Sequence, residues 1–192
     1  MRRLVSAAAL LAATGSSAYA QNTLPQRDDA YFRAAQAALQ ERLQVTPNTN
    51  RARNVILFVG DGMGISTVTA GRIYEGQKRG ADGESNSLTM EKLPYAALSK
   101  TYTHDAQVAD SAPTAVAMVT GVKTRNDVIG VNSDVEVGDC AGSKGKEVLG
   151  LAAMAERAGQ ATGVVSTARI THATPAAMYA HTPSATGKGM RT

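Results

Sequence analysis

Cysteine, tryptophan and long apolar runs are scarce or absent in this 192-residue chain. Cys140 is the only cysteine, and there is no tryptophan. No internal disulfide is therefore possible. No segment is apolar for long enough to span a membrane. The chain also lacks a basic stripe interleaved with aromatic residues, so nucleic-acid binding is not expected despite a net charge of +4.

The first twenty residues have the pattern of a secretory signal peptide. Arg2 and Arg3 precede an apolar stretch over residues 4–13, and Ala18-Tyr19-Ala20 forms an A-x-A cleavage site. We therefore expect export to the periplasm or the extracellular space, with the mature chain starting at Gln21. Removing the two arginines leaves 18 basic and 16 acidic residues, a net charge of only +2.

The rest of the chain divides into an arm and a main domain. Residues 21–53 predict an N-terminal arm, consisting of a helix over 28–45, capped by Asp28 or Asp29, and a linker over 46–53. This helix either packs on the main domain or reaches a partner subunit. Residues 54–192 hold the main domain, which is long enough to bury a core.

Strands and helices alternate along the main domain. Short apolar runs predict strands over 54–60, 96–102 and 162–167, and helices are expected over 65–77, from Ser111 to Gly121, and over 145–158. This order predicts an α/β fold with a mostly parallel sheet sandwiched by helices and joined by right-handed crossovers. A long polar loop over 124–144 contains Cys140.

An acidic residue follows the first of these strands. The run Val55-Ile56-Leu57-Phe58-Val59 ends at Gly60-Asp61-Gly62-Met63-Gly64. Ligands of α/β sheets collect at the carboxyl ends of strands, and a buried carboxylate needs a partner or a metal. Asp61 therefore predicts a metal or phosphate site. The alternative is a glycine turn in which Asp61 only caps the next helix.

Two other segments offer polar groups at corresponding places. Ser111 lies at the start of a helix in Asp110-Ser111-Ala112-Pro113, where free N–H groups and the helix dipole suit a phosphoryl group. Ser111 is either a nucleophile, most naturally activated by a metal, or one of a pair of capping residues. His172 and Thr174 follow the strand 162–167, as Asp61 follows the strand 54–60.

Taken together, these segments resemble the alkaline phosphatases. The resemblance is carried in order by NVILFVGDGMG, LSKTYTHDAQVADSAPTAVAMVTGVK and GVVSTARITHATPAAMYAHT, and extends from about Asp28 to Ser184. It implies metal-dependent hydrolysis of phosphate monoesters through a phosphoserine intermediate, with two Zn²⁺ ions and one Mg²⁺ ion. It also implies a homodimer for the intact protein.

The resemblance assigns a role to each candidate residue. Ser111 would be the nucleophile and a ligand of the second zinc. Asp61 would bridge that zinc and the magnesium, and Thr174 would bind the magnesium. His172 would lie beside the magnesium site, whereas His181 would be structural.

The sequence departs from the family in its last residues. The family has an arginine directly after the residue matching Ser184, whereas this chain has Ala185 and ends in SATGKGMRT. One nucleotide inserted after the Ser184 codon can convert that ending to SRDWEGDAD. We therefore hypothesise a frameshift or sequencing error, with a naturally variable loop as the alternative; resequencing the coding DNA tests it.

The remaining zinc ligands are expected from later parts of longer family members. The chain is therefore expected to be an incomplete, poorly folded and inactive form of the domain. Two other functions remain open, a non-catalytic fragment that binds metal or phosphate, and a related sulfatase or phosphomutase with a different nucleophile. Cys140 is either a free buried thiol or the partner of a cysteine beyond residue 192.

Overall fold

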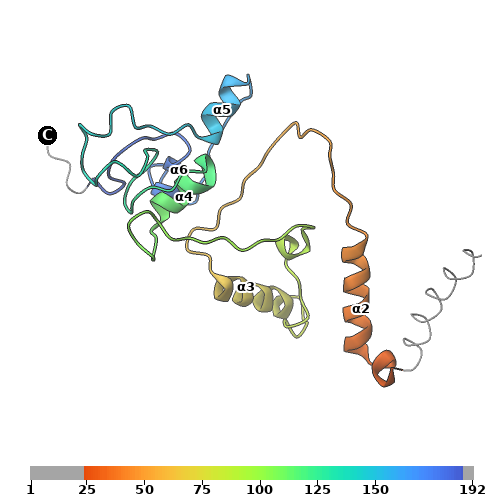
Figure 1. Cartoon of the computed structure of the whole chain (residues 1–192). Helices are drawn as coiled ribbons and strands as arrows, with labels where there is room; N and C mark the ends of the chain where they lie inside the picture. Colours follow the sequence, from red (N-terminus) through yellow and green to blue (C-terminus); the bar gives the residue numbers. More distant parts are fainter. Residues whose placement is uncertain (1–23, 188–192) are drawn as a thin grey trace, which may run out of the picture. The chain divides into compact units, whose positions relative to one another are not determined.

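A computed structural model describes residues 24–187, which form two compact units (Figure 1). In the described range, one unit contains residues 24–55 and 92–95, and the other contains residues 56–91 and 96–187. The predicted signal peptide lies outside the described residues. In the described range, no helix is both long and apolar enough to cross a membrane.

The first unit consists mainly of one capped helix. A 3-10 turn, η1, spans Pro25–Asp28, and α2 spans Ala30–Leu43. Asp29 is the N-cap, because its carboxylate accepts a hydrogen bond from the Phe32 N–H at 3.0 Å. This confirms the predicted helix and selects Asp29 as its cap. No residue of α2 is buried.

The second unit contains the remaining α-helices, which agree with the predicted ones to different degrees. They are α3 at Ile65–Lys78, α4 at Ser111–Thr120, α5 at Leu151–Arg157 and α6 at Ala173–Ala176; a 3-10 turn, η2, spans Thr89–Lys92. The helices predicted over 65–77 and from Ser111 are confirmed. The helix predicted over 145–158 was wrong in its first turns, since α5 begins only at Leu151.

Backbone pairing with the long loop explains the shorter α5. The Val148 N–H donates to the Gly130 carbonyl at 2.9 Å, and the Asn132 N–H donates to the Lys146 carbonyl at 3.0 Å. Val131 and Glu147 form an antiparallel bridge. These bonds hold residues 146–148 in an extended conformation that a helix cannot share.

The predicted strands are not paired with one another. Residues 54–60, 96–102 and 162–167 form no strand, and the bridges of the described range are isolated ones, including Ile129 with Thr182. A β-strand is held by backbone hydrogen bonds to a neighbouring strand, and in the described range these three segments form no such ladder. Most of their apolar side chains are exposed, with Phe58 at 89% and Val165 at 99%. The parallel sheet is therefore not confirmed.

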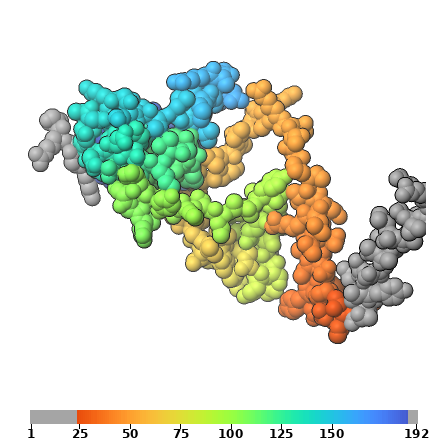
Figure 2. All heavy atoms as spheres, in the orientation of Figure 1, coloured from red at the N-terminus to blue at the C-terminus, as the bar shows by residue number. Residues whose placement is uncertain are grey.

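The core of the second unit is built around α4. This helix contacts α6 and α5, and the loop after it packs back against it (Figures 1 and 2). One buried cluster comprises Ala112, Ala115, Val116, Val119, Ile129, Ala176 and Ala177. The apolar character of α4 explains its burial, and the cluster fixes the helix whose first residue is Ser111.

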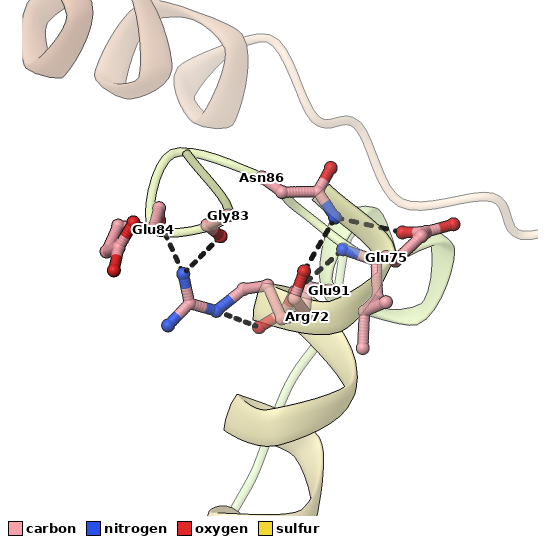
Figure 3. A network of polar contacts seen from close by, with 7 residues as sticks. Arg72, Glu75, Gly83, Glu84, Asn86 and Glu91 are labelled. Atoms are coloured by element: carbon pink, nitrogen blue, oxygen red, sulfur yellow. Dashed lines mark hydrogen bonds and ion pairs between the residues drawn. The ribbon is translucent and has the colours of Figure 1, made fainter. Parts of the chain in front are cut away.

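A polar network ties α3 to the loop that follows it (Figure 3). The Asn86 side chain donates to the Arg72 carbonyl and to the Glu75 carboxylate, both at 3.0 Å. Arg72 in turn reaches the Gly83 carbonyl at 3.5 Å and the Glu91 carboxylate at 3.9 Å. These bonds fold residues 79–91 onto α3, the helix that leads away from the Asp61 turn.

Candidate active site

Asp61 lies in a glycine turn and does not cap the next helix. The Met63 N–H donates to the Gly60 carbonyl at 3.3 Å, and Gly62 has a φ of 69°, a conformation that favours glycine. The N-cap of α3 is Gly64, where no side chain forms a capping bond. The capping alternative for Asp61 is therefore wrong, and its carboxylate is available for another contact.

That contact is with the segment that begins α6. The Thr174 hydroxyl donates a hydrogen bond to Asp61 Oδ2 at 2.8 Å. His172 Nδ1 lies 3.5 Å from the same oxygen. His172 is the N-cap residue of α6, and Thr174 lies in its first turn. Two segments 113 residues apart in the sequence thus meet at one carboxylate oxygen, as the family resemblance implied.

The donor set at this point fits part of a site for a divalent cation. His172 Nδ1 is a buried atom with no hydrogen-bond partner in the described part of the chain, and buried polar atoms are rarely left so. It lies beside the Asp61 carboxylate, which the Thr174 hydroxyl also contacts, and carboxylate and hydroxyl oxygens are ligands that hard cations prefer. The set is incomplete, because residues 24–187 contain no group of three or more His, Cys, Asp or Glu side chains suited to a metal.

Ser111 is the first residue of α4 and is partly buried. The hydrogen bonds and ion pairs of the described residues join Asp61, His172 and Thr174 to one another and leave Ser111 outside that group. The serine hydroxyl forms no hydrogen bond within that range, so it is not consumed by capping. Asp110 performs that role, with Oδ1 accepting from the Ala112 N–H at 2.8 Å.

Two residues that the sequence analysis did not single out hold Asp110 in place. The Asn126 side chain accepts from the Asp110 N–H at 3.3 Å and donates to the Val108 carbonyl at 3.2 Å. The Asp127 N–H donates to Asp110 Oδ2 at 2.7 Å. The Asn-Asp pair in a polar loop was a turn signal, but its tertiary partners carry no sequence signature.

Two further residues received roles from the sequence. His181 Nε2 lies 3.2 Å from the Val148 carbonyl, a contact of the kind expected for a structural histidine. Cys140 is a free and exposed thiol, so the alternative of a buried thiol is wrong. Its pairing with a more distant cysteine stays a prediction.

A profile of alkaline phosphatases matches residues 52–189 of this chain. This range contains more than half of the sequence and every candidate site residue. The chain belongs to the alkaline phosphatase family. Family membership favours the alkaline phosphatase interpretation over the sulfatase and phosphomutase alternatives.

Curated alkaline phosphatases share close to half of their residues with the matched region. The tissue-nonspecific isozyme of Gallus gallus is 48% identical over 158 residues, which cover 81% of this chain and 30% of the relative. The alkaline phosphatase of Gadus morhua is 49% identical over 148 residues, covering 77% and 31%. The chain thus spans about 30% of the length of these alkaline phosphatases.

Solved alkaline phosphatases also resemble this chain in structure. The cold-active alkaline phosphatase of a psychrophilic Shewanella species superposes with a TM-score of 0.55 and 32% identity, covering 66% of this chain and 29% of that one. The enzyme of Thermus thermophilus gives a TM-score of 0.56 and 29% identity, covering 79% and 29%. Both likenesses are consistent with the alkaline phosphatase fold.

Proposed function

We propose that this chain carries the nucleophile and part of the metal site of an enzyme that hydrolyses phosphate monoesters. The observation that carries the proposal is the meeting of Asp61, His172 and Thr174 within a region that matches the alkaline phosphatase family. Asp61 and Thr174 would hold a magnesium ion with His172 beside it, and Asp61 and Ser111 would contribute to one of two zinc ions. Bound metals would neutralise charge on the phosphate oxygens and lower the pKa of water.

The covalent step is assigned to Ser111. Its oxygen would attack phosphorus, the P–O bond to the leaving alcohol would break, and a phosphoserine would form; water would then cleave the new P–O bond and release phosphate. The start of α4 supports this role, because its free N–H groups and dipole favour a phosphoryl group. The Asp110 cap leaves the Ser111 hydroxyl free for the attack.

We also propose that the complete activity belongs to a protein of the length of the relatives. In that protein residues 54–60, 96–102 and 162–167 would be strands of the family's sheet. Their exposed apolar side chains support this, since a sheet with helices on both faces would bury them. Such a protein would be exported and dimeric, with the metal set completed by residues outside this chain.

The test compares two proteins supplied with zinc and magnesium. One is the 192-residue chain, and the other is a fusion in which residues 24–184 replace the matching part of the Gadus morhua alkaline phosphatase, called here the Gadus fusion. Hydrolysis of a chromogenic phosphate monoester is expected from the fusion, and less than about 1% of that rate from the 192-residue chain, because several charge-stabilising groups are missing together. Comparable metal-dependent rates of the two proteins would refute the proposal that the complete activity needs residues outside this chain.

Ser111→Ala in the Gadus fusion tests the nucleophile. Turnover is expected to fall by at least about 1,000-fold, with no labelled phosphate trapped on the protein after acid quenching. Ser133→Ala is the matched control, because Ser133 lies in the neighbouring loop and, among residues 24–187, only its backbone carbonyl forms a hydrogen bond, with Arg125. Phosphate trapped on the Ser111→Ala protein would overturn the assignment. Phosphate or metal binding without turnover in the fusion would instead favour the non-catalytic alternative.

A further inference from the structure

Asp127 has a backbone conformation that is unusual for its residue type. Its φ is 62°, and it is the one non-glycine residue between positions 24 and 187 with a positive φ. The left-handed region costs an L-residue free energy, although aspartate tolerates it better than most residues do. A residue held in this region needs compensating contacts, and Asp127 has them on both sides.

On one side Asp127 binds the segment that follows Pro183. Its carboxylate accepts hydrogen bonds from the Ser184 hydroxyl, the Thr186 N–H and the Thr186 hydroxyl, each at 3.0 Å. Its backbone carbonyl accepts from the Ala185 N–H at 2.6 Å. Ser184 is only 4% exposed, so its hydrogen bond to Asp127 is partly shielded from water, whereas the two bonds from Thr186 are exposed. The Asp127 carboxylate thus binds Ser184 and Thr186, and its backbone carbonyl binds the residue between them.

On the other side Asp127 binds the residue before the proposed nucleophile. Its N–H donates to Asp110 Oδ2 at 2.7 Å, the length of a charge-assisted bond. The other oxygen of Asp110 caps α4 through the Ala112 N–H. One oxygen of the Asp110 carboxylate therefore binds Asp127 and the other binds the start of α4. Because of this, the orientation of residue 127 sets the orientation of Asp110, the residue before Ser111.

We propose that Asp127 is a positioning residue for Ser111. Its carboxylate, held by the buried Ser184 hydroxyl and in this chain also by Thr186, keeps the backbone in the left-handed conformation that aims its N–H at Asp110, and Asp110 fixes the first turn of α4. This inference rests on the proposed role of Ser111 as the nucleophile. It extends that role by making the geometry of the serine depend on a residue 16 positions later and on a segment more than 70 positions later.

Two substitutions of Asp127 separate the carboxylate from the backbone. Asp127→Gly removes the carboxylate but permits a positive φ and keeps the N–H and carbonyl. Asp127→Asn retains an acceptor oxygen and also tolerates this conformation. Asp139→Gly is the control, because the Asp139 carboxylate lies in the same loop and accepts from the Gly142 N–H at 2.8 Å in a local turn.

Amide hydrogen exchange in the 192-residue chain is the first readout. With Asp127→Gly, the amides of residue 127 and Ala112 are expected to exchange about tenfold faster, because the hydrogen bonds to Asp110 become less populated. Asp127→Asn should restore most of the protection, and Asp139→Gly should not affect it. Faster exchange at Ala185 and Thr186 alone would overturn the proposal, because Asp127 would then only tether the segment. An equal rise at Val116 inside α4 would overturn it too, since that is a loss of fold.

Turnover in the Gadus fusion, which keeps the Ser184 contact of Asp127 but not Ala185 or Thr186, is the second readout. Asp127→Gly is expected to lower kcat about tenfold with little change in KM, as for a misaligned nucleophile, and Asp127→Asn should recover most of the rate. An unchanged kcat would overturn the positioning role. Retained turnover in Ser111→Ala would instead be a failure of the proposed nucleophile. The exchange readout does not depend on that nucleophile, so the two failures are distinguishable.

Discussion

At the scale of single residues, carboxylates that accept several hydrogen bonds organise the surroundings of Ser111. Asp105 is one of them. Burial alone would raise the pKa of its carboxyl, but the Asn126 N–H and the Thr103 hydroxyl, each 3.0 Å away, together with its own N–H and the charge of Arg125, keep the pKa below its usual value. Asp105 therefore anchors the same Asn126 that holds Asp110.

This lowered pKa predicts an acid sensitivity. A carboxyl whose pKa is lower in the folded state stabilises the fold above its unfolded pKa of about 3.9, and the contribution disappears as pH falls through the folded value. Asp105→Ala is expected to lower the thermal unfolding midpoint at pH 7. On moving from pH 7 to pH 3, the midpoint of this variant should then fall less than that of the unmodified chain. Thermal unfolding at both pH values measures this, with Asp28→Ala in the other unit as control. An unchanged midpoint at pH 7 would contradict it.

The candidate site was only partly predictable from single residues. Asp61, His172 and Thr174 were expected to lie together because the resemblance to the alkaline phosphatases places all three at or beside one magnesium site, and they do. Asp127 was not expected, because its left-handed backbone and its contacts with Asp110 and the segment 184–186 arise from tertiary structure. The position of Ser111 at a helix start was predictable, since Asp110, Pro113 and Gly121 mark the ends of α4 locally.

At the scale of elements, helices were predicted better than strands for a physical reason. The bonds of a helix are local, so caps and periodicity fix α2, α3 and α4 within a residue or two. Strands need a neighbouring strand to bond with, and the described range contains no strand that pairs with residues 54–60. The predicted helix over 145–158 lost its first turns to long-range pairing with the loop 124–144, which sequence periodicity does not reveal.

The ends of α4 give a prediction at this scale. Gly121 has a φ of 76° and terminates α4, and a Cβ there would meet no atom within 4 Å. Gly121→Ala is therefore expected to cost about 1 kcal/mol, entirely from backbone strain. Gly71→Ala is the matched control inside α3, where space is also open and stability should rise by about 0.5–1 kcal/mol. Chemical denaturation measures both, and a stabilising Gly121→Ala would contradict the argument.

At the scale of the whole molecule, order is expected to be uneven. The cluster around α4 is almost fully buried, whereas residues 55–59 and Val165 expose apolar side chains. In the 192-residue chain the amides of Ala115–Val119 should therefore exchange at least about 100-fold more slowly than those of 55–59, which should exchange like an unstructured peptide. Exposed apolar segments without strand partners should also promote aggregation on concentration.

Hydrogen exchange followed by mass spectrometry measures this difference, and light scattering measures the association. In the Gadus fusion the amides of 55–59 should become protected, because the proposed sheet would supply neighbours for them. Protection of 55–59 in the 192-residue chain by itself would contradict the prediction.

The hydrogen bond between Asp61 and Thr174 has a consequence for the order of assembly. It closes a loop of 113 residues, which costs about 4 kcal/mol of chain entropy by the logarithmic scaling of loop length. It also cannot form before residue 174 has been synthesised, whereas α3, the helix after Asp61, can form as soon as its own residues are available. The Asp61 carboxylate therefore lacks this partner until at least 113 further residues have been synthesised.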